Sequence, residues 1–200
     1  MELFVNGQKI DFSLEGETTV GDVLRSFEER AAANEATTTG IAINGQKIAA
    51  EEIEQYFDKS LEEVMRLELQ AVSKGAIWET LLASAKVFRE LSLSLEDVPA
   101  ALQSGRDREA GETIAKLADE IGDFCRAVEM SSLFPEVHSS LTSGEDAVSG
   151  ILEEFPRIFG ELEQSLKDKD TVASGDICEY EVAPRLKMIA QAVEAAAIKA

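Results

Sequence analysis

Apolar and polar residues alternate over the first 14 positions of the chain, in two runs separated by Asn6-Gly7. In a strand, every second side chain points to the same face of the sheet. An Asn-Gly pair favours a type I′ turn, because both central residues of that turn need positive φ. The pattern therefore predicts a β-hairpin over residues 2–14. Its shared apolar face would consist of Leu3, Val5, Ile10, Phe12 and Leu14.

The next segment has the period of a helix. Apolar residues recur three or four positions apart from Val20 to Ala31. Thr19 has the side chain of a typical N-cap, and Asp22 falls in the first turn, where the positive end of the helix dipole stabilises a carboxylate. We expect one amphipathic helix that ends near Asn34.

Further strand signals follow this helix. A threonine-rich stretch, residues 37–39, is expected to be a loop that leads into a buried strand and a second Asn-Gly turn at Asn44-Gly45. A short helical stretch is predicted over residues 51–56. Alternation over residues 64–71 then predicts a half-buried strand. The inner positions of that strand are Met65, Leu67, Leu69 and Ala71.

Three phrases of this segment, FVNGQKIDF, TTVGDVL and GIAINGQKI, resemble the ubiquitin-like β-grasp superfamily, and most closely its small sulfur carriers of thiamine and molybdopterin synthesis. The resemblance covers residues 1–73 and implies a β-grasp domain. Those carriers react through a free carboxy-terminal Gly-Gly. Here the last strand is followed by Ser73-Lys74-Gly75-Ala76, and the chain continues to Ala200. A divergent sulfur carrier or ubiquitin-like modifier is therefore the disfavoured alternative.

From Ala76 onward the apolar period is about 3.6 residues, as in helices. Four long helices are predicted, with a shorter one that ends at Gly105. Pro156 and Pro184 should each kink a helix, because proline removes a backbone hydrogen bond. Short connections favour an up-and-down bundle. The long helices are expected over residues 76–91, 106–133, 145–166 and 171–193, the last capped by Asp170 and with an inner stripe that begins at Val172.

The fold class expected from these patterns is α+β. A ubiquitin-like β-grasp domain over residues 1–73 precedes an all-α, up-and-down helical bundle over residues 76–200. Within the bundle, the phrase DKDTVASGDICEYEVAPRL resembles helices of uncharacterised bacterial proteins.

The charge of the chain restricts its partners. The sequence contains 19 basic and 39 acidic residues, a net charge of -20. Such a chain repels nucleic acid and anionic membrane surfaces. The charge is consistent either with solubility alone or with a basic protein partner, and both interpretations stay open. The chain has neither a signal-like start nor an apolar run of about 20 residues, so we expect a cytoplasmic protein without membrane association.

The sequence offers little for catalysis, cofactors or metals. Cys125, Cys178 and the single His138 do not form a ligand motif, and His138 is expected in a solvent-facing loop bounded by proline and serines. Carboxylates at 168, 170 and 176 suggest a calcium loop only faintly, because Val172 occupies a ligand position. Trp78 and Tyr180 are the candidate interaction residues, although their helical spacing favours a place in the core.

These observations predict a protein that is not an enzyme and has no catalytic, metal or cofactor site. The leading hypothesis is a non-catalytic cytosolic adaptor or scaffold that binds a protein partner through the exposed β-grasp sheet or a groove of the bundle. An export or assembly chaperone for a basic or apolar client is one alternative. A structural homodimer is another.

Overall fold

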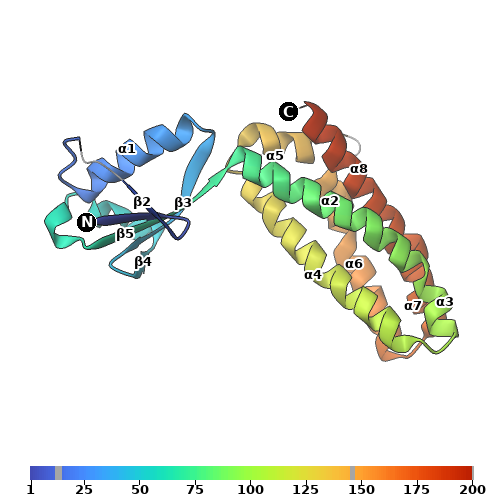
Figure 1. Ribbon diagram of the computed structural model, residues 1–200. Helices are drawn as coiled ribbons and strands as arrows, with labels where there is room; N and C mark the ends of the chain where they lie inside the picture. Colours follow the sequence, from blue (N-terminus) through green and yellow to red (C-terminus); the bar gives the residue numbers. More distant parts are fainter. Residues whose placement is uncertain (12–14, 145–146, 200) are drawn as a thin grey trace. The chain divides into compact units, whose positions relative to one another are not determined.

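The computed structural model describes residues 1–11, 15–144 and 147–199. The chain divides into two compact units, Met1–Ala76 and Ile77–Ala200. A mixed sheet with one long helix forms the first unit, and helices form the second (Figure 1). The expected α+β class is confirmed.

The described residues of the first unit build a five-stranded sheet of order β2-β1-β5-β3-β4. β1 and β5 are parallel, and the other neighbours are antiparallel. Both predicted Asn-Gly turns are confirmed: φ is 49° at Asn6, 79° at Gly7, 52° at Asn44 and 84° at Gly45. The strands are β1 (Glu2–Val5), β2 (Gln8–Ile10), β3 (Ala36–Ile43), β4 (Gln46–Ile48) and β5 (Arg66–Ser73).

The predicted helix is α1 (Val20–Ala32), and it begins with a capping box. The Thr19 hydroxyl accepts a hydrogen bond from the Asp22 amide (3.2 Å), and the Asp22 carboxylate accepts one from the Thr19 amide (3.0 Å). The amide of Thr18 and the guanidinium of Arg25 also donate to this carboxylate. These interactions, the Thr18 amide foremost, hold the pKa of Asp22 well below its ordinary value.

One face of the sheet packs with α1 into a single apolar core. The strand register pairs Leu3 and Ile43 with Leu67, so buried side chains from three strands meet on this face. The short 3-10 segments η1 (Ala50–Tyr56) and η2 (Leu61–Glu63) follow β4, and η1 corresponds to the predicted short helix. The buried members of this core are Leu3, Val20, Val23, Leu24, Ile43, Leu61, Val64, Leu67 and Leu69.

Two expectations for this unit are wrong. Residues 37–39 are not a loop, because β3 pairs with β5 from Ala36 onward, with a bulge between Thr38 and Gly40. Met65 is 77% exposed, because it precedes the paired part of β5. Phe12 and Leu14 lie outside the residues that the structure describes, so their place on the hairpin stays a prediction.

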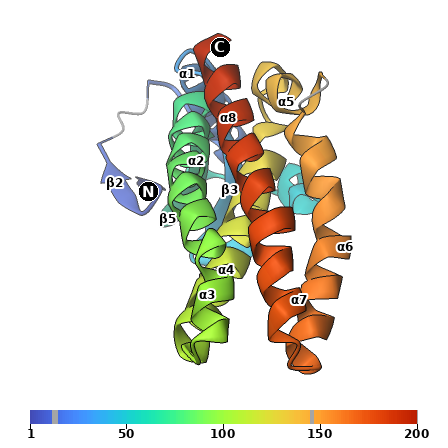
Figure 2. The same cartoon turned by 90° about the vertical axis from the view of Figure 1, so that its right-hand side faces the viewer.

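The second unit is a helical bundle, as predicted. Four long helical segments, α2, α4, α6 and α7–α8, alternate in direction along the chain (Figure 2). In the interior, the rings of Phe88 and Phe124 lie 5.0 Å apart in an edge-on arrangement. The helices are α2 (Lys74–Glu96), α3 (Val98–Gln103), α4 (Asp107–Ser131), α5 (Pro135–Thr142), α6 (Val148–Lys167), α7 (Thr171–Asp176) and α8 (Ala183–Lys199), with the π-helical segment η3 (Ile177–Val182) before α8.

The helix ends correct several expectations. His138 lies in α5, because Pro135 begins a helix there, a position that suits its fixed φ. The predicted start at Glu145 lies outside the described residues, and α6 begins at Val148. Asp170 caps α7 as predicted, since its carboxylate accepts from the Ala173 amide. Pro156 lies within α6, where it does not end the helix, whereas Pro184 follows the π-helical segment.

Candidate functional site

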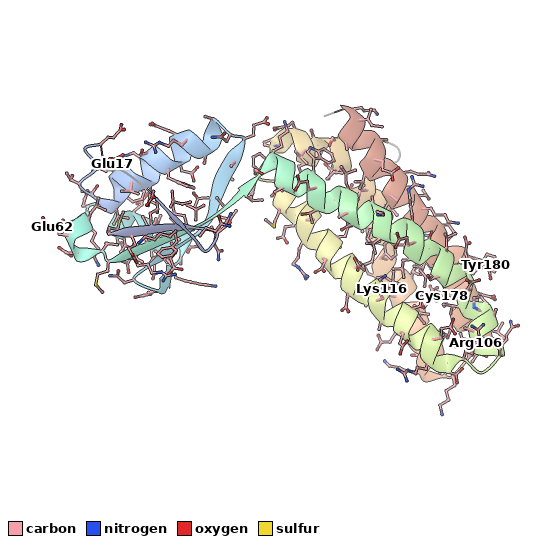
Figure 3. The ribbon with its side chains drawn as sticks, viewed as in Figure 1. Glu17, Glu62, Arg106, Lys116, Cys178 and Tyr180 are labelled. Atoms are coloured by element: carbon pink, nitrogen blue, oxygen red, sulfur yellow. The ribbon has the colours of Figure 1, made fainter. Side chains whose placement is uncertain are left out.

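An apolar groove lies between α4 and α6, at the end of the bundle formed by α3 and α7. It consists of a cavity of about 590 Å³ and an adjoining one of about 290 Å³. The two cavities have Ile114, Ala118 and Leu166 in common. Arg106, labelled in Figure 3, lies at the turn just before α4, where the groove begins. We call this feature the α4–α6 groove and define it by Gly111, Ile114, Ala115, Ala118, Phe159 and Leu166.

The spacing of apolar residues in α4 explains why this helix contributes to two surfaces. Leu117, Ile121 and Phe124 face the bundle interior and are buried. The groove residues of α4 form a neighbouring stripe with steps of three and four residues, and Ala115 and Ala118 are exposed. The apolar face of α4 is therefore wider than its contact with the core requires.

The α6 side of the groove carries larger side chains. Phe159 is half-buried, Leu166 is 42% exposed, and Leu162 at the base is only 3% exposed. The ring centres of Phe155 and Phe159 lie 5.0 Å apart, so the Phe159 ring packs against Phe155 of the same helix. Apart from Ile114, the α4 wall of the groove thus has small side chains, whereas the α6 wall has large ones.

Three charged residues line the groove in the described part of the bundle: Asp107, Glu163 and Lys169. Glu163 pairs with Lys167 at 2.5 Å, and this hydrogen bond lowers the pKa of the Glu163 carboxyl. Both partners are largely exposed, so the pair contributes little to stability. The surrounding unit contains 12 basic and 24 acidic residues.

Neither Trp78 nor Tyr180 is among the residues that line the groove. Trp78, in the first turns of α2, is half-buried, and its indole nitrogen has no hydrogen-bond partner among the described residues. Tyr180 is 64% exposed, so the core position favoured by its spacing is wrong. A hydrogen bond with Glu179 raises the pKa of its hydroxyl.

The π-helical segment explains why Tyr180 is exposed. The Ala183 amide donates to the Cys178 carbonyl, five residues back, which changes the rotation of the helix relative to the 3.6-residue period. Cys178 takes the interior position instead, and burial raises the pKa of its thiol to about 12. Figure 3 labels both residues. Val172 is 60% exposed, so its predicted place on the inner stripe, which also followed from the 3.6-residue period, is wrong.

Ser131 and His138 form a side-chain hydrogen bond that the sequence did not predict. The Ser131 hydroxyl lies 3.0 Å from Nδ1 of His138. The same hydroxyl donates to the Val128 carbonyl at 2.5 Å, which leaves the imidazole to donate to the serine oxygen. Ser131 is fully buried. The pair therefore joins α4 to α5, and it lacks the arrangement of an accessible nucleophile beside a base.

Across residues 1–11, 15–144 and 147–199, no group of three histidine, cysteine or acidic side chains is placed to hold a metal ion. Within the same ranges, no helix has the length and apolar character needed to cross a bilayer.

Comparisons with known proteins match both units. Residues 1–73 match the family model described as TP0873 N-terminal domain, and residues 79–192 match the model described as domain of unknown function DUF8042. An uncharacterized protein of Treponema pallidum (strain Nichols) is 23% identical over 193 residues, which is 96% of each chain. The predicted likeness to uncharacterised bacterial proteins is confirmed. No solved structure matches.

Proposed function

We propose that this chain, which belongs to the family described as domain of unknown function DUF8042, is a non-catalytic cytoplasmic adaptor that binds a protein partner through the α4–α6 groove. The observation that carries the proposal is the groove itself, a contiguous apolar surface with exposed Ala118 and Leu166. Apolar surface left open to water in this way is typical of interaction sites.

The composition of the groove supports a protein as its ligand. Phe159 and Leu166 supply large apolar contacts, and Asp107, Glu163 and Lys169 are the charged residues beside them. Large apolar contacts with charged residues beside them are common in protein interfaces. A catalytic site would in addition need a nucleophile, base or oxyanion donors in mutual hydrogen-bond geometry.

A cytoplasmic location is part of the proposal. Cys125 and Cys178 are both free thiols, and Cys125 is exposed. An exposed unpaired thiol is more stable in a reducing compartment than in an oxidising one.

For the first unit we propose the ubiquitin-like β-grasp fold. Its support is the strand order β2-β1-β5-β3-β4, with a parallel central pair and a helix that connects two antiparallel hairpins. The sulfur-carrier alternative loses support, because Gly75 lies in the first turn of α2 rather than in a free tail. We regard this unit as a platform without carrier chemistry.

An export or assembly chaperone is a second candidate, favoured by the combination of an apolar groove with a net charge of -20. A chaperone binds a client before the client is assembled, whereas an adaptor binds the assembled protein. If the captured protein binds only in its unassembled form, the chaperone role is the correct one.

Paired substitutions test the proposal. The full chain and its Ala118→Glu, Leu166→Glu and Leu93→Glu variants are used to isolate partners from the cells that make it, with quantitative mass spectrometry. Leu93 is a matched control, because it is 59% exposed on α2, away from the groove. We expect a protein that is retained by wild type and Leu93→Glu and lost by both groove variants. Circular dichroism confirms that each variant is folded. Equal recovery with all four proteins would refute the proposal.

A further inference from the structure

We infer that the occupant of the α4–α6 groove is a single amphipathic helix of a partner protein, with an apolar stripe flanked by lysine or arginine. This inference rests on the proposed function and specifies the chemistry of the partner.

The shape of the groove matches a helix. The small residues on α4 span Gly111 to Ala118, two turns, or about 10 Å along the axis. That length matches apolar side chains at positions i, i+3, i+4 and i+7 of a bound helix, the usual anchors when a helix docks in a groove. A Cβ atom placed on Gly111 would meet nothing within 4 Å, so the space above this wall is open.

The two walls differ in size, which favours close helix packing. Gly111, Ala115 and Ala118 let another backbone approach α4, because the distance between packed helices depends on the side chains at the contact. On the opposite wall, Phe159 and Leu166 provide the large apolar side chains against which a leucine stripe would pack.

The chemistry of the lining disfavours an extended peptide. An extended chain needs partners for its backbone amides and carbonyls. The centre of the groove presents apolar side chains of two helices, whose own backbones are already hydrogen-bonded within α4 and α6. A helix satisfies its backbone internally, and therefore it can bury an apolar face there without loss of hydrogen bonds.

Charge selects between a second copy of this chain and another protein. The helical unit contains 12 basic and 24 acidic residues, so its overall charge is strongly negative. The groove lining itself has Asp107, Glu163 and Lys169, and Glu163 pairs with Lys167, so the negative charge is that of the unit as a whole. A second copy would bring the same negative charge and repel the first. Lysine or arginine beside the apolar stripe of a partner would be complementary.

The native cysteines allow a direct test. Cys125 is exposed on α4, seven residues after Ala118 and so on nearly the same side of the helix, whereas Cys178 is fully buried. An environment-sensitive fluorophore attached to Cys125 of the full chain therefore reports on the groove. The probes are three synthetic peptides of about 18 residues: a leucine-striped helix with lysine flanks, the same helix with glutamate flanks, and a scrambled lysine sequence.

We expect the lysine-flanked helix to bind. The other two peptides should bind at least about tenfold more weakly, since the loss of about 1.4 kcal/mol of binding free energy lowers affinity about tenfold. Leu166→Glu should weaken binding of the lysine-flanked helix by about tenfold or more. Leu93→Glu, with the same added charge, should stay within about twofold of wild type. Equal affinity of the scrambled peptide, or equal affinity for Leu166→Glu, would show general electrostatic attraction and overturn the inference.

Three further measurements separate this inference from the proposed function. If light scattering shows a dimer of the full chain and Leu166→Glu abolishes this dimer, a second copy is the occupant and the inference is overturned. Native mass spectrometry would also overturn it by finding a small apolar molecule bound to wild type and absent from Leu166→Glu. If a natural partner depends on the groove but hydrogen exchange maps its contact to a non-helical or acidic segment, the inference fails while the proposed function stands. If no partner depends on the groove, both fail.

Discussion

The two units of this protein differ in how far their apolar surfaces are buried. In the first unit, the apolar face of the sheet is covered by α1, and Leu67 and Leu69 on that face are at most 1% exposed. In the second unit, the apolar stripe between α4 and α6 has no covering element in the part of the chain that the structure describes, and Leu166 is 42% exposed.

The other face of the sheet sharpens this contrast. It is open, but its residues satisfy one another: Arg66 pairs with Glu68 at 2.8 Å and lies over the Phe4 ring, and Lys9 pairs with Glu2. An open polar face of this kind is stable in water without a partner. Exposure alone therefore does not mark a binding site. A contiguous uncovered apolar surface is the better indicator, and on this basis we propose the groove rather than the sheet as the site of interaction.

The largest predicted effect distinguishes core from groove within α4 and α6. Phe124→Ala removes a fully buried ring in contact with Phe88 and should lower the free energy of unfolding by about 3–5 kcal/mol. Leu166→Ala, in the groove, should cost less than about 1 kcal/mol. Urea unfolding followed by the fluorescence of Trp78, the single tryptophan, measures both. Similar losses would mean that Leu166 belongs to the core and that the groove is closed in solution.

The next largest effect concerns the covered face of the sheet. Leu69→Ala should destabilise the first unit by about 2–5 kcal/mol, because it leaves a cavity under α1. Met65→Ala, at a position that is 77% exposed, is the control and should change stability by about 0.5 kcal/mol or less. Amide hydrogen exchange in the strands reports on this unit separately. A large effect of Met65→Ala would indicate that the open side of the sheet is covered after all.

Local signals made much of this architecture predictable. Asn6-Gly7 and Asn44-Gly45 determine their turns through positive φ, and Thr19 determines the start of α1 through its own hydroxyl. In each case the cause lies within about four residues of the effect. Sequence alone was sufficient there.

Structure that depends on distant residues was not predictable in the same way. Residues 37–39 are strand because β3 pairs with β5, and the partners of Thr37 and Thr38 lie 35 and 33 positions further along the chain. The exposure of Tyr180 depends on a π-helical register that a 3.6-residue period does not contain. A groove of the bundle was expected, but its residues were not, for a related reason: Ala118 has the spacing of an inward-facing residue of α4, and only the positions of α6 and α7 show that it faces outward.

A smaller effect is expected where α1, the cover of the sheet, begins. Thr19→Ala removes the hydroxyl that accepts from the Asp22 amide and should cost about 1 kcal/mol. Thr171→Ala is a matched control, since Thr171 is the first residue of α7 but Asp170 supplies the cap. We expect faster hydrogen exchange in α1 for Thr19→Ala only. Unchanged exchange would mean that packing alone holds the helix in place over the sheet.

The same capping box makes the stability of α1 sensitive to acid. Because hydrogen bonds lower the pKa of Asp22 in the folded state, its carboxylate stabilises α1 at pH values above its unfolded pKa of about 3.9. This stabilisation is lost as the pH falls from about 4 toward the folded pKa. Wild type should therefore lose stability on going from pH 7 to pH 3 more steeply than Asp22→Asn does, measured by urea unfolding with exchange in α1. Parallel pH profiles would contradict this role.

The smallest predicted effect tests whether the open sheet face is self-sufficient. The Arg66 guanidinium lies 4.0 Å from the centre of the Phe4 ring and pairs with Glu68, so Arg66→Ala should cost about 0.5–1 kcal/mol, less at high salt. Lys47→Ala, at an exposed residue of the edge strand β4, is the control and should have almost no effect. Removal of Arg66 also uncovers part of Phe4 and gives the sheet an apolar spot of the kind that the groove already has. If Arg66→Ala nevertheless leaves partner capture unchanged while Leu166→Glu abolishes it, the groove is the interaction surface. Loss of the partner with Arg66→Ala would instead place that surface on the sheet.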